Sequence, residues 1–170
     1  SFTKIEDTQG RLILDNQPET TEVVSEQTAF IMKDILQELK NSRVVQPAQV
    51  ENIATAGKTG TSGTSEYNTD SWFAGFTPYM TSAVWIGSDN PNITIDEIAS
   101  YAVRLWGHIM RSMHEGYEPK EFDMPDGIVE AEVCTQSGKK PTSLCRQDSR
   151  GTVELEYFVK GTEPVEECDA

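Results

Sequence analysis

The chain has 170 residues, enough for one ordinary domain, and its 36% hydrophobic and 25% charged residues suit a globular core with a solvated surface. The formal net charge of −14 argues against nucleic acid as a partner and against binding to an anionic membrane by charge alone. No apolar run approaches the roughly 20 residues of a membrane span, and no signal peptide opens the sequence. Since Ser1 is not an initiator Met, we expect a piece of a longer protein.

The first part of the sequence predicts a β-hairpin followed by a helix. Residues 2–14 alternate in polarity around turn-forming residues at 7–10, and residues 15–24 make a polar connector. Ser25 is the expected N-cap of a helix over residues 26–40. The apolar stripe of this helix is spaced at three and four residues and is expected to pack on a sheet: Ile31, Met32, Ile35, Leu36 and Leu39.

The stretch at 56–62, Ala-Gly-Lys-Thr-Gly-Thr-Ser, is predicted to be a strand whose end borders a cleft. Because strand side chains alternate, Lys58 and Gly60 should share one face and Thr59 and Thr61 the other. Lys58 offers a charge with three donors, and the threonine hydroxyls can bind a carboxylate. Gly60 leaves room for close approach, and free N–H groups of an edge strand could stabilise an oxyanion.

A polar turn over 62–70 is expected next, followed by two antiparallel strands. These strands should cover 72–76 and 81–86 and be joined by a turn at 77–80. Their aromatic residues, Trp72, Phe73 and Trp85, could form a sugar-stacking platform. Core packing of sheet against helix is the favoured interpretation.

A second helix is predicted from a capping box at 94–97 to a stop at Gly116. Neither His108 nor His114 has a plausible nucleophile nearby, so both are interpreted as surface or packing residues. The helix is strongly amphipathic, and its predicted buried stripe comprises Ile98, Ala102, Leu105, Trp106, Ile109, Met110 and Met113.

The last quarter begins with a Pro- and acid-rich linker over 117–127, and short strands are predicted at 128–133 and 153–159. All three cysteines of the chain lie in this quarter: Cys134, Cys145 and Cys168. In an oxidising compartment, Cys134 and Cys145 could form a disulfide, which leaves the third cysteine free or paired elsewhere. A zinc site is the weaker alternative, because no Cys-x-x-Cys and no nearby His is present.

Two further motifs follow the Gly-Lys-Thr-Gly-Thr segment. They are Asp-x-Trp-Phe-x-Gly-Phe-Thr-Pro at 70–78 and Val-Trp-Ile-Gly-x-Asp at 84–89. Together the three motifs closely resemble the transpeptidase domain of class A penicillin-binding proteins, from about residue 2 to residue 115 and more loosely beyond. The resemblance implies an α/β (α+β) fold, an antiparallel sheet packed by helices. Residues 1–116 would be the C-terminal part of that domain, and 117–170 a linker with a small β-rich, cysteine-containing extension.

The resemblance also implies a chemistry, which is serine-type acyl transfer without a cofactor or metal. The family cross-links peptidoglycan stem peptides through an acyl-enzyme, and β-lactam antibiotics mimic the D-Ala-D-Ala end of its substrate. By position, Lys58 would be the electrostatic and proton-relay residue. Thr59, Gly60 and Thr61 would bind substrate, and the Thr61 N–H would donate to the oxyanion.

The family's nucleophilic Ser-x-x-Lys and its Ser-x-Asn both precede the Lys-Thr-Gly strand. The literal Ser-x-x-Lys at 1–4 lies in a strand pattern, and the Ser-Asp-Asn at 88–90 follows the motif at a strand end, so we interpret both as fortuitous. The nucleophile is then expected on the N-terminal half of the domain, as a partner outside this chain. The parent would be anchored at the extracytoplasmic face of a bacterial membrane and carry a glycosyltransferase. A β-lactamase-like hydrolase and a silent β-lactam sensor remain the alternatives.

Overall fold

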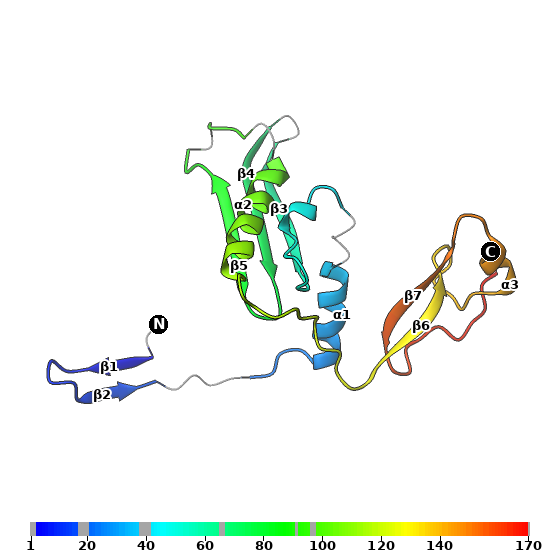
Figure 1. Ribbon diagram of the computed structural model, residues 1–170, viewed down its shortest axis with the longest axis horizontal. Helices are drawn as coiled ribbons and strands as arrows, with labels where there is room; N and C mark the ends of the chain where they lie inside the picture. The colour runs from blue at the N-terminus through cyan, green and yellow to red at the C-terminus, as the bar shows by residue number, and fades with distance from the viewer. Residues whose placement is uncertain are drawn as a thin grey trace.

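The computed structural model is a mixed α/β structure with antiparallel sheets, as the sequence predicts (Figure 1). A hairpin, a central sheet with its helices, and a second hairpin follow one another along the chain. No helix among the described residues has both the length and the apolar character to cross a membrane. The structure describes residues 3–16, 21–37, 42–64, 67–90, 92–95 and 98–169.

The N-terminal hairpin is confirmed. Strands β1 (Lys4–Glu6) and β2 (Leu12–Asp15) pair antiparallel. The Asp7 carboxylate closes the turn by accepting hydrogen bonds from the backbone N–H groups of Gln9 at 2.8 Å and Arg11 at 2.9 Å. Residues 1 and 2 of the literal Ser-x-x-Lys lie outside the described residues, and its Lys4 lies in β1 rather than in a helix.

The central sheet has the strand order β3 (Ala56–Gly63), β4 (Asn68–Phe76) and β5 (Thr81–Gly87), with both pairs antiparallel. The turn between β4 and β5 is the predicted one, since the Thr77 N–H donates to the Met80 carbonyl at 2.8 Å. Strands β3 and β4 continue further into the polar segment than the predicted turn at 62–70 allowed.

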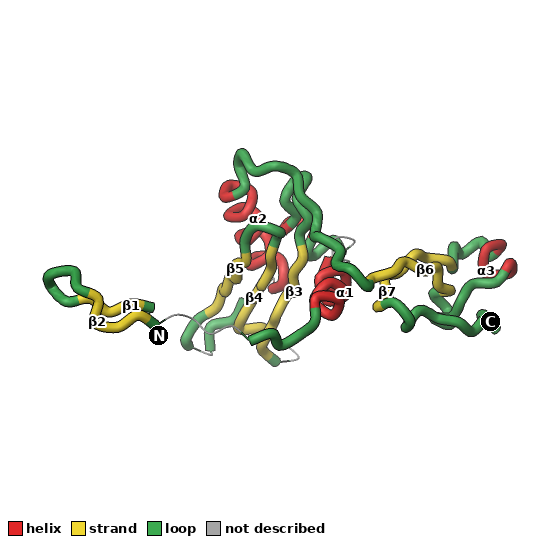
Figure 2. The backbone as a smooth tube through the Cα atoms, turned by 90° about the horizontal axis from the view of Figure 1, so that it is seen from below, coloured by secondary structure: helices red, strands yellow, loops and turns green. Residues whose placement is uncertain are grey.

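Helix α2 (Ile98–Met113) covers one face of this sheet, and helix α1 (Glu26–Gln37) lies beside β3 (Figure 2). Phe73 of β4 meets Trp106 of α2 edge to face, with ring centroids 5.1 Å apart. The indole N–H of Trp106 donates to the Ser82 carbonyl at 3.1 Å, so this ring is buried without an orphaned donor. The core consists of Val45, Ala48, Val50, Ile53, Phe73, Val84, Ala102, Val103, Trp106 and Met110.

The predicted buried stripe of α2 is only half right. Residues 102, 106 and 110 are buried as predicted, but Leu105, Ile109 and Met113 are exposed. The helix has apolar side chains on two faces, and only one of them meets the sheet. Residues 96 and 97 of the predicted capping box at 94–97 lie outside the described residues.

Gly107 lets α2 approach the 3-10 helix η2 (Gln46–Ala48) closely. A Cβ atom at Gly107 would lie 2.1 Å from the Pro47 carbonyl oxygen. The Arg111 guanidinium fixes the same contact by donating to the carbonyl oxygens of Pro47 at 2.9 Å and Gln49 at 3.0 Å. The segment before β3 is therefore held against α2 through backbone atoms.

Of the two histidines, which were predicted to be surface or packing residues, one is at the surface and one is buried. His108 is exposed. His114 is buried, and its Nδ1 donates to the Met110 carbonyl at 2.7 Å. The Thr77 hydroxyl lies 2.9 Å from His114 Nε2. Because it accepts hydrogen bonds from two backbone N–H groups, it donates its own hydrogen bond to the ring nitrogen.

Helix α1 (Glu26–Gln37) is capped as predicted, since the Ser25 hydroxyl accepts from the Thr28 N–H at 3.2 Å. The predicted stripe packs only in part. Phe30, which was not assigned to it, is buried, whereas Met32 and Ile35 are exposed. Its last predicted member, residue 39, lies outside the described residues.

The C-terminal unit contains β6 (Ile128–Cys134), a short helix α3 (Ser143–Gln147) and β7 (Val153–Val159), with β6 and β7 antiparallel. The two strands are confirmed, and α3 was not predicted. The possible Cys134–Cys145 disulfide is not formed. All three cysteines are buried and outside any disulfide, and their sulfur atoms lie within 4.8 Å of one another.

Candidate functional site

The Lys-Thr-Gly segment lies on β3, an edge strand of the sheet among the described residues. Lys58 pairs with Ala74 and Gly60 with Trp72, so both lie on the face that α2 does not cover. Thr59 and Thr61 pair with Phe73 and Ser71, whose side chains are buried on the α2 side. The predicted alternation of the four residues along the strand is therefore present.

Lys58 is exposed, and its Nζ donates to the Thr59 carbonyl at 3.0 Å. No ion pair within the described part of the chain includes Lys58. Thr61 is exposed and Thr59 is half-buried. The segment thus presents a cation and hydroxyl groups at an open strand edge, where part of the backbone N–H groups has no strand partner.

The two glycines around Lys58 have different surroundings. A Cβ atom at Gly57 would lie 2.6 Å from the Phe73 ring and 2.9 Å from the Ala74 carbonyl oxygen, so packing alone requires this glycine. At Gly60 the nearest atom would be the Trp72 Cβ at 3.2 Å, and nothing else would lie closer than 3.8 Å. Because Gly60 has no side chain, it leaves the strand backbone next to Lys58 accessible.

Trp72 and Trp85 lie on the same uncovered face, which contradicts the expectation that they pack in the core. Their rings stack at a centroid distance of 5.9 Å, and Trp72 is 46% exposed and Trp85 43% exposed. The reason is their register, since Trp72 pairs with Trp85 on the face opposite Phe73. Of the three aromatic residues expected in the core, Phe73 is buried.

Asp70 anchors one end of this face. Its carboxylate accepts from the Trp85 indole N–H at 2.8 Å, from the Thr69 hydroxyl at 2.7 Å, and from the Ser62 hydroxyl across the strand. These donors, with Ser62 first, lower the pKa of Asp70 below its ordinary value of 3.8. The sequence analysis assigned no role to Asp70. The pattern that could have indicated one is the pair of hydroxyl residues at 62 and 69, which lie on the paired ends of β3 and β4.

Asp70→Asn should reduce stability in a pH-dependent way. The folded state favours the charged carboxylate, so its pKa is below the unfolded value, and the stabilisation is complete above 3.8 and lost as the pH falls through the folded-state pKa. The free energies of unfolding of the wild type and the variant, measured with urea, should therefore differ by a constant amount down to about pH 5 and converge below that. Asp89→Asn is the control for loss of one exposed carboxylate; a difference that persists at acid pH would contradict the prediction.

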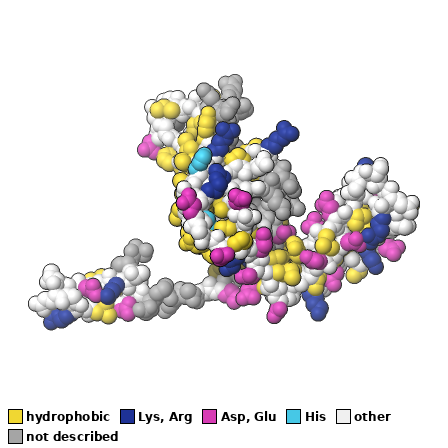
Figure 3. Space-filling model, in the orientation of Figure 1, with side chains coloured by type: hydrophobic (Ala, Val, Ile, Leu, Met, Phe, Trp, Pro, Cys, Tyr) yellow, Lys and Arg dark blue, Asp and Glu magenta, His cyan; other side chains and the backbone are white. Residues whose placement is uncertain are grey.

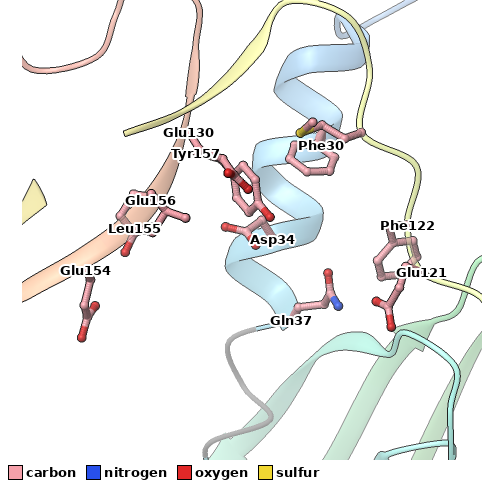
Figure 4. Close-up of a pocket in the computed structure, with 11 residues that line it drawn as sticks. Phe30, Asp34, Gln37, Glu121, Phe122, Glu130, Glu154, Leu155, Glu156 and Tyr157 are labelled. Carbon is pink, nitrogen blue, oxygen red and sulfur yellow. The ribbon is translucent and has the colours of Figure 1, made fainter. Parts of the chain in front are cut away.

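A cavity of about 570 Å³ lies away from this site, between α1, the linker and the β6–β7 hairpin (Figure 4). Its lining is acidic, and acidic side chains also gather on this side of the molecule in Figure 3. Burial raises the pKa of Tyr157, which lines the cavity, and the nearby Glu130 acts in the same direction.

No residue of β3 lines the 570 Å³ cavity, and a smaller cavity meets β3 only at Ala56 and Gly57. Lys58 is exposed and lines neither of these two cavities.

Comparison with known families decides what this surface belongs to. Residues 2–97 match the family model described as the penicillin binding protein transpeptidase domain. The chain belongs to this family. Members catalyse acyl transfer, and a second model, described as the C-terminal domain of penicillin-binding protein 1A, matches residues 124–170 of this transpeptidase-family chain.

Curated relatives agree with this assignment. Penicillin-binding protein 1A of Clostridium perfringens (strain ATCC 13124) is 40% identical over 171 residues, which cover 99% of this chain and 20% of that protein. Penicillin-binding protein 1A/1B of Bacillus subtilis (strain 168) is 33% identical over 168 residues, which cover 89% of this chain and 18% of that protein. The chain thus spans about one fifth of the length of the curated relatives it matches.

The fold has a solved counterpart. The crystal structure of penicillin-binding protein 1A from Haemophilus influenzae aligns with a TM-score of 0.68 at 20% identity, over 97% of this chain and 29% of that chain. At this identity the likeness shows the fold alone. It supports the expected architecture of an antiparallel sheet packed by helices, in a chain that corresponds to part of a larger protein.

Proposed function

We propose that this chain supplies the Lys-Thr-Gly strand, and not the nucleophile, of a peptidoglycan D,D-transpeptidase. The observation that carries the proposal is the placement of Lys58, Gly60 and Thr61 on an open edge strand within the family match. Substrates of such an enzyme end in a carboxylate next to the scissile amide. An exposed cation with neighbouring hydroxyl groups is suited to bind that end.

In this proposal, each residue of the Lys-Thr-Gly segment on β3 has its own role in acyl transfer. Lys58 raises the local positive potential and supports the transfer of the nucleophile's proton. The hydroxyl groups of Thr59 and Thr61 hold the substrate carboxylate, and Gly60 allows the peptide to approach the strand. The Thr61 N–H donates to the oxyanion that forms when a serine attacks the carbonyl carbon; loss of one such donor typically costs about 10²–10³ in rate.

The attacking serine comes from the remainder of the domain, as does the other wall of the cleft. Three surfaces of this chain lack a cover among the described residues and suit that remainder. They are the face with Trp72 and Trp85, the outer stripe of α2 with Leu105 and Ile109, and the free edge of β5. Apolar surfaces of this kind on a domain fragment mark places where further chain packs.

The wider context follows from the family and is part of the proposal. The division into residues 1–116, completing the transpeptidase domain, and 117–170, a linker with the C-terminal extension, belongs here. So do stem peptides as substrates, β-lactam antibiotics as ligands, a peptidoglycan glycosyltransferase on the same parent, and anchoring at the extracytoplasmic face of a bacterial membrane. None of these requires a metal or cofactor at β3.

Labelling with a fluorescent penicillin tests the proposal. The complete protein should be labelled stably at a serine that precedes residue 1 of this chain, whereas the isolated chain should remain unlabelled. Mass spectrometry of the labelled peptide identifies the serine. Rapid release of hydrolysed antibiotic would instead favour a β-lactamase-like hydrolase, and a complete protein that takes no label would favour a silent sensor.

A further inference from the structure

The three cysteines converge from separate segments of the C-terminal unit. Cys134 ends β6, Cys145 lies in α3, and Cys168 lies in the final segment, yet all three sulfur atoms are within 4.8 Å of one another. Only 2%, 6% and 8% of these residues is exposed, respectively. Three thiolates around one tetrahedral zinc ion, with Zn–S bonds of about 2.3 Å, lie about 3.8 Å apart. The sulfurs are therefore close to a metal-binding arrangement.

Backbone hydrogen bonds fix this arrangement. The Cys134 N–H donates to the Lys139 carbonyl at 2.8 Å, and the Cys168 N–H donates to the Lys140 carbonyl at 2.9 Å. The third segment is tied by the buried Thr152 hydroxyl, which donates to the Cys145 carbonyl at 3.2 Å. Because each cysteine is held through its backbone, the thiols are brought together before any ion binds.

Each sulfur also accepts a hydrogen bond from a nearby donor. The Ser137 hydroxyl donates to Cys168 Sγ at 3.1 Å, the Thr142 N–H donates to Cys145 Sγ at 3.4 Å, and the backbone N–H of Gln136 donates to Cys134. Donors of this kind stabilise a thiolate, which is the form that binds metal ions.

The C-terminal unit is small, and a bound metal ion or a disulfide would stabilise it. Its apolar cluster consists of the three cysteines with Val153 packed against them. Small units bury little apolar surface, and many of them are stabilised by disulfides or metals. A disulfide would join two of the sulfurs and leave the third as a thiol beside it, free to attack the bond. An ion uses all three.

We propose that Cys134, Cys145 and Cys168 bind a thiophilic metal ion such as Zn²⁺ through three thiolates. The fourth coordination position is taken by water or by a donor from outside the unit. Each thiol that coordinates releases its proton to solvent, so up to three protons leave for each ion bound. The site stabilises the C-terminal unit and is independent of the chemistry proposed for β3.

Metal titration of the reduced 170-residue chain tests this site. Zn²⁺ should bind one ion per chain in competition with a chromophoric chelator, and Co²⁺ should give a thiolate-to-metal charge-transfer band in the near ultraviolet. Cys134→Ser, Cys145→Ser and Cys168→Ser should each weaken Zn²⁺ binding by more than the roughly 100-fold that changes around the ligands cause. Ser143→Ala, an exposed change on α3 beside Cys145, should retain one ion with unchanged affinity.

Other results would overturn the proposal. One is a reduced chain that binds no Zn²⁺ or Co²⁺. Another is one cysteine variant that binds as tightly as the wild type. Cys168→Ser lies near the chain end and outside helices and strands, so it is the variant to use if either of the others does not fold. A chain that keeps one disulfide and one alkylatable thiol in the presence of excess Zn²⁺ would identify the cluster as a disulfide with a spare cysteine.

Discussion

Lys58→Ala in the complete protein should slow acylation by penicillin about 100- to 1000-fold, the range seen when one group that stabilises transition-state charge is removed. The free energy of unfolding should stay within about 0.5 kcal/mol of the wild type, as for most surface substitutions. The reason is that Lys58 is exposed and its Nζ donates to the carbonyl of the next residue. The measurements are the second-order rate of labelling by a fluorescent penicillin and urea unfolding.

Two further variants make the test specific. Lys160→Ala removes another exposed lysine, from the C-terminal unit, and should leave acylation unchanged. Lys58→Arg keeps the charge but cannot hand over a proton, so partial recovery would separate the electrostatic role from the proton relay. Wild-type acylation kinetics in Lys58→Ala would remove this side chain from the mechanism.

Gly107→Ala should destabilise the protein by about 3 kcal/mol, at the upper end of what overpacking usually costs. In an exposed helix the same change would stabilise by up to about 1 kcal/mol, because alanine is the better helix former. The sign reverses here because the new Cβ would lie 2.1 Å from the Pro47 carbonyl oxygen, a backbone atom that Arg111 also holds. Either α2 or η2 must move, and both contribute to the core.

The midpoint of urea unfolding, followed in the complete protein, measures this effect. Ser112→Ala is the matched control, an exposed position on the same helix where a small gain from helix propensity is expected. A stability of Gly107→Ala equal to or above that of the wild type would show that the approach of α2 to η2 is looser than the structure has it.

The elements that depend on local patterns were predictable from the sequence. The hairpin at β1–β2, the Ser25 cap, the strands β4 and β5 and the turn after Ser88 all follow from alternation, spacing and turn-forming residues. In that turn the Ser88 hydroxyl accepts from the Asn90 N–H at 3.1 Å, as expected for a local motif. The placement of Lys58 at a strand edge was predicted too, whereas its catalytic role stays a prediction.

What covers an apolar side chain was not predictable. The aromatic character of Trp72 and Trp85 suggested a core, and the spacing of Leu105 suggested a buried stripe, but spacing only shows that a face is apolar. Trp72 and Trp85 are exposed because they lie on the sheet face that α2 does not cover, and Leu105 is exposed because it lies on the side of α2 that does not meet the sheet. Alternation and spacing therefore identify which residues share a face, but not which apolar face is covered.

The sequence analysis treated a zinc site at the cysteines as the weaker alternative for a different reason. Cys168 lies 23 residues after Cys145, and no short motif links the two. They meet because Lys140 pairs in parallel with Glu167 in the final segment, a contact that joins two loops without a strand pattern. Spacing rules for zinc sites detect ligands that lie close in sequence, and here the fold brings them together.

The stacked pair on the uncovered sheet face has an optical consequence. The chain has three tryptophans, of which Trp106 is sealed against the sheet while Trp72 and Trp85 face solvent. Two of its three indole fluorophores therefore respond to whatever docks on this face, and the third reports only on the integrity of the core. Emission wavelength and accessibility to an ionic quencher can thus distinguish association of a neighbouring segment from unfolding, without an added dye.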